Sequence, residues 1–168
     1  MFGGVEDGRV FEVDMLGNKI QEWYSSGAVS KPVTEGSIAV DTDMFHHDVL
    51  ELASGNFLGL GLEVRSLKDF PVEYPPSNKK RTADVAGDVI IEFAPNGSTI
   101  REWSLVDILD PRRLGDGSLR GGHYYDIYKD RYDPLPYDIT HSNAIYYIEE
   151  EDAVLVSSNF QCAIYKID

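Results

Sequence analysis

Short apolar stretches separated by polar, glycine-containing turns run along the chain, and this pattern predicts β-strands rather than helices. Residues 10–14 and 19–23 form two such stretches joined by a tight turn. Residues 90–93 and 99–103 repeat them, and the two copies share Glu, Gly, Ile, Glu and Trp in register. Each copy therefore predicts a two-stranded hairpin whose second strand ends on a tryptophan.

A second kind of hairpin alternates with the first. Residues 46–52 and 57–60 form one copy, and residues 141–147 and 153–156 form another, each with a polar turn between its halves. Taken in chain order, one hairpin of each kind makes a unit of four antiparallel strands. Such units repeated around an axis are the blades of a β-propeller.

The repeat predicts one incomplete β-propeller domain over residues 1–168. A third copy of the first hairpin begins at 164–168 and stops before its turn, so about two to three blades are expected. Helical periodicity is absent apart from one turn at most at 106–109, which makes the fold class all-β. Two stretches break the repeat, at about 64–87 and 110–138, and are expected as loop insertions. The second carries five tyrosines and should fold over one face of the propeller.

Composition narrows the function classes. The net charge is −14 and the isoelectric point about 4.5, which argues against nucleic-acid binding because phosphate backbones are bound by Lys and Arg. No apolar run approaches the ~20 residues of a membrane-spanning helix, and no signal-peptide pattern is visible at Met1. P-loop and dinucleotide fingerprints are absent, so no cofactor is expected. Cys162, the single cysteine, is expected to be a small buried strand residue.

Three of the four histidines stand where strands of successive blades begin. The motifs at 46–48 and 141–143 both follow the pattern His-x-Asp/Asn. Because the first strand of each blade lines the central channel, His46, His47 and His141 are expected to converge near one mouth of that channel. Histidines there can donate hydrogen bonds or exchange protons near neutral pH. One register pairs His141 with His46, and the other pairs it with His47.

Plainer interpretations of the histidines stay open. They can be polar residues that close the channel with hydrogen bonds, or ligands of a metal ion, since histidine and aspartate bind metals. Adjacent histidines on a strand point to opposite faces, which disfavours a metal site. The fourth histidine, His123, lies in the tyrosine-rich insertion and is expected on the surface of a loop.

These motifs resemble those of the arylsulfotransferase family. The segments at 45–58, 88–103 and 141–168 carry the resemblance, which covers most of the chain outside the insertions. It implies a six-bladed β-propeller, exported to the bacterial periplasm, that moves a sulfuryl group from an aryl sulfate to a phenol without a nucleotide donor. The family's ping-pong mechanism passes through a sulfated histidine.

The resemblance also implies roles for single residues. His141 and Asn143 match the family's His-x-Asn pair that binds the sulfuryl group, and His46 or His47 matches the catalytic histidine of an earlier blade. Asn159 stands at a substrate-binding position where the family usually has an arginine, and an amide cannot supply the same charge or bidentate contact. The nucleophilic histidine is expected in a blade beyond this sequence.

Two other functions remain open at this point. One is a non-catalytic β-propeller of the same lineage that serves as a binding or scaffold protein, which Asn159 favours. The other is a metal-dependent propeller hydrolase. The expected partners are a small-molecule aryl sulfate and a phenol, with no nucleic acid and no membrane, and association into a homo-oligomer is left open.

Overall fold

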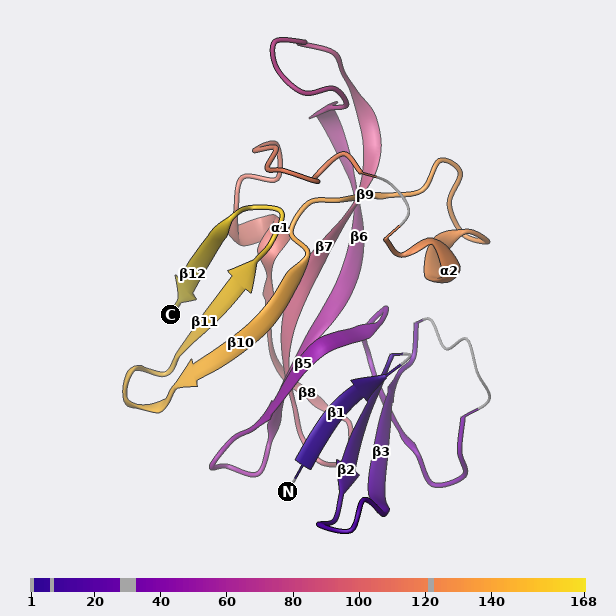
Figure 1. Cartoon of the computed structure of the whole chain (residues 1–168), viewed down its shortest axis with the longest axis vertical. Helices are drawn as coiled ribbons and strands as arrows, with labels where there is room; N and C mark the ends of the chain where they lie inside the picture. The colour runs from indigo at the N-terminus through magenta and orange to yellow at the C-terminus, as the bar shows by residue number, and fades with distance from the viewer. Residues whose placement is uncertain (1, 7, 28–32, 121–122) are drawn as a thin grey trace.

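The computed structural model describes residues 2–6, 8–27, 33–120 and 123–168, with the backbone alone described for 2–6. Its strands form three sheets that follow one another along the chain (Figure 1). Almost all of the pairing is antiparallel, and helices are limited to single turns. The predicted all-β fold, a partial β-propeller of antiparallel blades, is therefore confirmed.

The first sheet has the order β1-β2-β3-β4. The hairpin predicted at 10–14 and 19–23 forms its centre, where Val10 pairs with Trp23. A further strand lies on each side of this hairpin, antiparallel to it before β2 and parallel to it after β3. The strands are β1 (Phe2–Glu6), β2 (Arg9–Val13), β3 (Lys19–Ser25) and β4 (Ile38–Val40).

The second sheet joins one hairpin of each kind in the order β5-β6-β7-β8, as the repeat predicts. All three pairings along this path are antiparallel. A two-residue strand, β9 (Tyr137–Asp138), pairs parallel to β7 outside this path. The four main strands are β5 (Phe45–Glu51), β6 (Phe57–Pro71), β7 (Lys80–Phe93) and β8 (Thr99–Ser104).

The third sheet contains β10 (Ser142–Ile148), β11 (Ala153–Ser158) and β12 (Ala163–Ile167) in that order. Strand β5 of the second sheet contacts both β1 and β10, so the inner strands of the three sheets lie together (Figure 1). Three single turns of helix complete the chain: α1 (Leu105–Ile108), which was expected, and α2 (Tyr125–Tyr128) and the 3₁₀ turn η1 (Glu149–Glu151), which were not. No helix of the described residues is long and apolar enough to cross a membrane.

The stretch at 64–87 is mostly strand, which corrects the expectation of a loop. Strands β6 and β7 stay paired from Phe57 opposite Phe93 out to Pro71 opposite Lys80, with one irregularity between Leu67 and Phe70. Prolines and charged residues hide this extension in the sequence, because they occupy the exposed tip and face of the hairpin. Its inner face is apolar, and Phe70 is fully buried there.

The insertion at 110–138 supplies the cover for that apolar face. Its residues Leu114 and Leu119 pack against the cluster around Phe70, and Tyr128 is buried against Leu62 of β6. Apart from α2 and β9, its described residues form turns and irregular backbone. This segment therefore fixes the extended hairpin and carries its own aromatic residues towards the start of β10.

Cys162 is exposed, which corrects the expectation of a buried strand residue. It lies in the turn between β11 and β12 and has a positive φ of 48°. Its backbone N–H donates to the carbonyl oxygen of Asn159 at 3.0 Å, which closes the turn. The apolar pattern of the neighbouring residues belongs to β12 and begins one position later, at Ala163.

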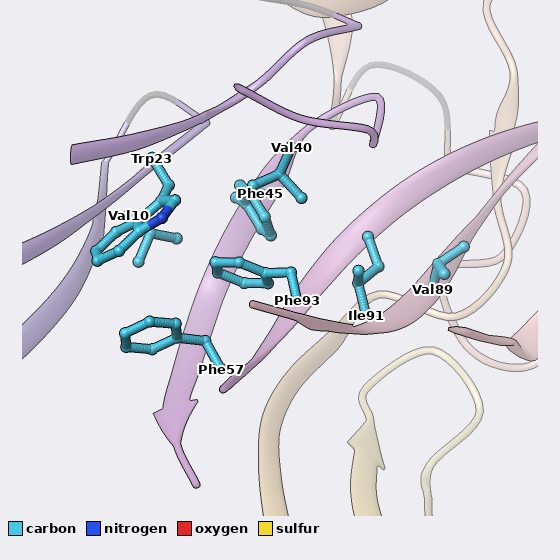
Figure 2. Packing of buried hydrophobic residues seen from close by; sticks show 8 residues of the cluster. All are labelled: Val10, Trp23, Val40, Phe45, Phe57, Val89, Ile91 and Phe93. Atoms are coloured by element: carbon cyan, nitrogen blue, oxygen red, sulfur yellow. The ribbon is translucent and has the colours of Figure 1, made fainter. Parts of the chain in front are cut away.

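An aromatic core joins the first and second sheets. Figure 2 shows the rings of Trp23, Phe45, Phe57 and Phe93 gathered between them. The ring centroids of Trp23 and Phe57 are 4.7 Å apart. The indole Nε1 of Trp23 also donates to the carbonyl oxygen of Pro95 at 2.8 Å, a hydrogen bond from one sheet to the turn of the next.

Replacing Trp23 by phenylalanine is expected to lower the free energy of unfolding by about 1–3 kcal/mol. The smaller ring loses packing, and the Pro95 carbonyl loses its donor in a partly buried position. Trp103→Phe is the matched control at the repeated position, because its indole makes no hydrogen bond within the described residues. Urea denaturation of both variants checks this, and equal losses would contradict a specific contribution of the inter-sheet bond.

Candidate functional site

The four histidines form one cluster where β5 and β10 begin. The ring centroids of His46 and His47 are 5.2 Å apart, and those of His47 and His141 are 5.5 Å apart. His123 joins from the 110–138 segment, with its ring centroid 4.9 Å from that of His141. The predicted meeting of His46, His47 and His141 is therefore present, although their chemical roles stay predictions.

An irregularity in the pairing of β5 with β6 lets both His46 and His47 face the cluster. The register shifts between His46, which pairs with Leu60, and Val49, which pairs with Gly59. His47 lies in this bulge with a positive φ of 53°, so the usual alternation of side chains is lost. His46 is buried and His47 is exposed, and their Nδ1 atoms are 3.0 Å apart.

Backbone conformation makes His47, rather than His46, the counterpart of His141. His141 has a positive φ of 46°, close to that of His47, and lies next to the register shift between Ser142 and Ala144. Residues other than glycine adopt this region rarely, so the shared conformation reflects a shared local structure. Exposed His47 and half-buried His141 thus share a backbone conformation beside irregularities in neighbouring sheets.

Asp138 holds both the backbone and the ring of His141. Its Oδ1 accepts the backbone N–H of His141 at 3.1 Å, and its Oδ2 lies 2.6 Å from Nδ1. The other face of the imidazole stacks on Phe160, with centroids 4.6 Å apart and ring planes 16° from parallel. Asp138 is itself placed by β9, which pairs it with Ala86 of β7.

Asp88 plays a similar part on the other side of the cluster and is fully buried. Its Oδ2 accepts the backbone N–H of Ser142 at 2.5 Å, and its Oδ1 lies 3.2 Å from Nε2 of His46. Burial raises the pKa of the Asp88 carboxyl, but the contacts with His46 and Ser142 outweigh burial and leave it below its ordinary value. Asp88 is thus an ionised carboxylate at the His46 end of the histidine cluster, and Asp138 lies at the His141 end.

The environment moves the pKa values of the neighbouring imidazoles in opposite directions. The hydrogen bond to Asp138 raises the pKa of His141 against the effect of burial. Burial lowers the pKa of His47, and the charges of His46 and His141 lower it further. Burial also raises the pKa of Asp138, which the bond from His141 partly offsets. Divergent pKa values in adjacent groups are a common arrangement in acid–base chemistry.

We expect His141 to titrate above the ordinary histidine pKa of 6.5 and His47 to titrate below it. Between the two midpoints His141 is cationic while His47 is neutral, because a raised pKa keeps the proton as pH increases. The imidazole proton resonances, followed by NMR between about pH 5 and 8, measure both midpoints. Coincident midpoints, or the reverse order, would contradict the assignment.

Two residues of the site, His123 and Tyr124, were not predicted as site residues from the sequence. His123 was expected on a loop surface; its side chain is exposed, but it contacts His141 and the ring of Phe160. Tyr124 lies beside it, with ring centroids 6.1 Å from His46 and 6.0 Å from His141. Burial raises the Tyr124 pKa, as do the charges of Asp88 and Asp138. The Gly-Gly-His-Tyr-Tyr run inside a long insertion was the available signal.

The two asparagines lie at the exposed edge of the cluster. Asn143 sits in the bulge of β10, where its Oδ1 accepts the hydroxyl of Ser157 at 2.6 Å. Asn159 is exposed, and its backbone N–H donates to the carbonyl oxygen of His141 at 3.1 Å. The backbone of Asn159 therefore supports His141 directly, while its side chain brings no charge to the site.

A metal ion has no ready-made set of ligands in the described part of the chain. No group of three or more His, Cys, Asp or Glu side chains there has the geometry to hold one. The chemistry that the cluster offers directly is therefore that of imidazoles and carboxylates: proton transfer, nucleophilic attack and hydrogen bonding to an anion.

Comparison with known families identifies the family of this chain. The sequence model of the family described as Arylsulfotransferase (ASST) matches residues 1–168. A search of curated proteins finds no match.

Proposed function

Since the chain belongs to the arylsulfotransferase family, we propose that it serves the transfer of a sulfuryl group from an aryl sulfate to a phenolic acceptor. The observation that carries the proposal is the cluster of His46, His47, His123 and His141 between two buried carboxylates. Imidazoles in such a cluster can bind an anion in one protonation state and accept a proton in the other.

The proposed reaction has two halves, as in the family. A histidine nitrogen attacks sulfur, the bond from sulfur to the aryl oxygen breaks, and the phenolate leaves and takes a proton from solvent. The acceptor phenol then gives its proton to a base, its oxygen attacks sulfur, and the sulfur–nitrogen bond breaks. Cationic His141, with Asn143, is proposed to stabilise the sulfuryl oxygens, and neutral His47 to accept the proton. We assign the nucleophile to no residue of this chain.

The test is a transfer assay with an aryl sulfate whose phenol is coloured and a second, colourless phenol. We expect release of the coloured phenol and formation of the sulfated acceptor in equal amounts, without a nucleotide sulfate and with no effect of a chelator. Release of inorganic sulfate in place of a sulfated acceptor would contradict transfer. Loss of activity on chelation would instead favour the metal-dependent hydrolase.

A second candidate function is binding without turnover. It is favoured by Asn159, which stands where the family usually has an arginine and leaves the sulfuryl group without that charge. Calorimetry with the same aryl sulfate separates the two candidates, because a binding protein takes up the ester and returns it unchanged. An exported, periplasmic location is part of the proposal on family grounds alone.

A further inference from the structure

Two buried carboxylates lie at the ends of two short chains of polar contacts in the histidine cluster. Asp138 contacts His141 directly, through Oδ2 and Nδ1 at 2.6 Å. Asp88 acts through His46, whose Nε2 lies 3.2 Å from Oδ1 of Asp88 and whose Nδ1 lies 3.0 Å from Nδ1 of His47. One chain therefore runs from a buried carboxylate to half-buried His141, and the other to exposed His47.

The partners fix where the protons lie in the Asp88 chain. Nε2 of His46 also faces the carbonyl oxygen of Gly61 at 3.2 Å, and both this oxygen and an ionised carboxylate can only accept. Nε2 of neutral His46 must therefore carry the proton, which leaves its Nδ1 as an acceptor. Nδ1 of His47 must then donate to it, so neutral His47 has its free lone pair on Nε2.

The contact with Asp138 fixes the proton of the second chain in the same way. When Asp138 is ionised, its Oδ2 can only accept, so Nδ1 of His141 carries a proton and Nε2 holds the lone pair of the neutral ring. Within the described residues, Nε2 of His47 and Nε2 of His141 have no hydrogen-bond partner. The imidazoles of His47 and His141 thus offer the same nitrogen, although the Nε2–H form is the one that free histidine favours.

We propose that Asp138 and the Asp88–His46 pair are positioning groups that hold His141 and His47 as Nδ1–H tautomers and keep both Nε2 atoms free for the reacting groups. The assignment of tautomers rests on the contact geometry together with ionised carboxylates, while its catalytic consequence rests on the proposed function. Holding an imidazole by a carboxylate at Nδ1 is a known way to orient a catalytic histidine.

Asp138→Asn tests the proposal because one contact decides how the new amide is turned. The backbone N–H of His141 needs the acceptor that Oδ1 of Asp138 supplies at 3.1 Å. An asparagine that keeps this bond with its carbonyl oxygen turns its NH₂ group towards Nδ1 of His141. Nδ1 then becomes an acceptor, and the proton of the neutral ring moves to Nε2.

Long-range proton–nitrogen NMR spectra of the ¹⁵N-labelled chain, recorded above both titrations, report the tautomer of each ring. We expect Nδ1–H for His47 and His141 in the unmodified protein. In Asp138→Asn, His141 should change to Nε2–H while His47 stays unchanged as an internal control. In the transfer assay, kcat should fall on the order of 10²-fold with KM within a few-fold, because the substrate-binding groups remain.

Glu92→Gln is the matched control for the loss of a buried carboxylate. Glu92 is buried, and its carboxylate accepts hydrogen bonds from Asn56 and Arg101, outside the histidine cluster. This variant should therefore leave all four tautomers unchanged. An Nε2–H tautomer for His141 in the unmodified protein would overturn the proposal, as would an unchanged tautomer in Asp138→Asn. If the unmodified protein transfers no sulfuryl group, the proposed function fails, and the spectra still decide the positioning role.

Discussion

Replacement of His141 by alanine is expected to reduce sulfuryl transfer by about 10²- to 10⁴-fold. The substitution removes the imidazole that carries the raised pKa, and with it the donor proposed for the sulfuryl oxygens. Asp138 then loses its ring partner inside the site. The rate of transfer from an aryl sulfate to a phenol, measured at saturating and at low donor concentration, gives the effect on kcat and on kcat/KM.

Met15→Ala is the control for this measurement, because Met15 is 90% exposed in the turn between β2 and β3 of the first sheet. It should transfer the sulfuryl group at the unmodified rate. A His141→Gln variant separates charge from shape, since glutamine can donate a hydrogen bond but cannot become a cation. Activity that survives His141→Ala would count decisively against the proposed site.

The strands of each blade were predictable because they depend on residues that are close together in the sequence. Each hairpin is set by its apolar alternation and its turn, and the second sheet joins its four strands in the order that the repeat requires. The meeting of the histidines followed from the same logic, since equivalent positions of neighbouring sheets lie near one axis. Local pattern together with a repeat was thus sufficient to bring His46, His47 and His141 together.

The carboxylates that hold these histidines were not predictable in the same way. Asp138 reaches the site through β9, a strand of only two residues whose parallel pairing with β7 has no local signal. Asp88 lies in an apolar strand and binds the backbone of Ser142, which is 54 positions away in the chain. The role of Asp88 depends on how the second and third sheets pack together, and a single sequence does not specify the distance between two sheets.

The sequence left the choice between His46 and His47 open for a related reason. An ungapped alignment of the two motifs places His46 opposite His141. The backbone conformation instead makes His47 equivalent to His141, because both residues have positive φ values. The two bulges differ in length, because the register shift of β5 passes over two residues and that of β10 over one. A motif alignment without gaps cannot represent this difference.

The aromatic core leads to the largest expected effect on stability. Replacement of Phe93 by alanine should lower the free energy of unfolding by about 3–5 kcal/mol, the range for removing a buried phenylalanine. Phe93 is fully buried, with its ring 5.4 Å from both Phe45 and Phe57 and 6.2 Å from Trp23 of the first sheet (Figure 2). Its loss opens a cavity that rigid strands on both sides cannot close.

The size of this loss tests whether the first two sheets share one core. Urea denaturation measures this loss of stability when it is followed by far-ultraviolet circular dichroism and by tryptophan fluorescence. The fluorescence reports on both sheets, because Trp23 lies in the first sheet and Trp103 in the second. We expect both probes to shift together in Phe93→Ala and neither to shift in Leu16→Ala, whose side chain is 87% exposed. A loss below about 1 kcal/mol, or separate transitions for the two probes, would mean that the sheets are stabilised independently and that the aromatic contact between them contributes little.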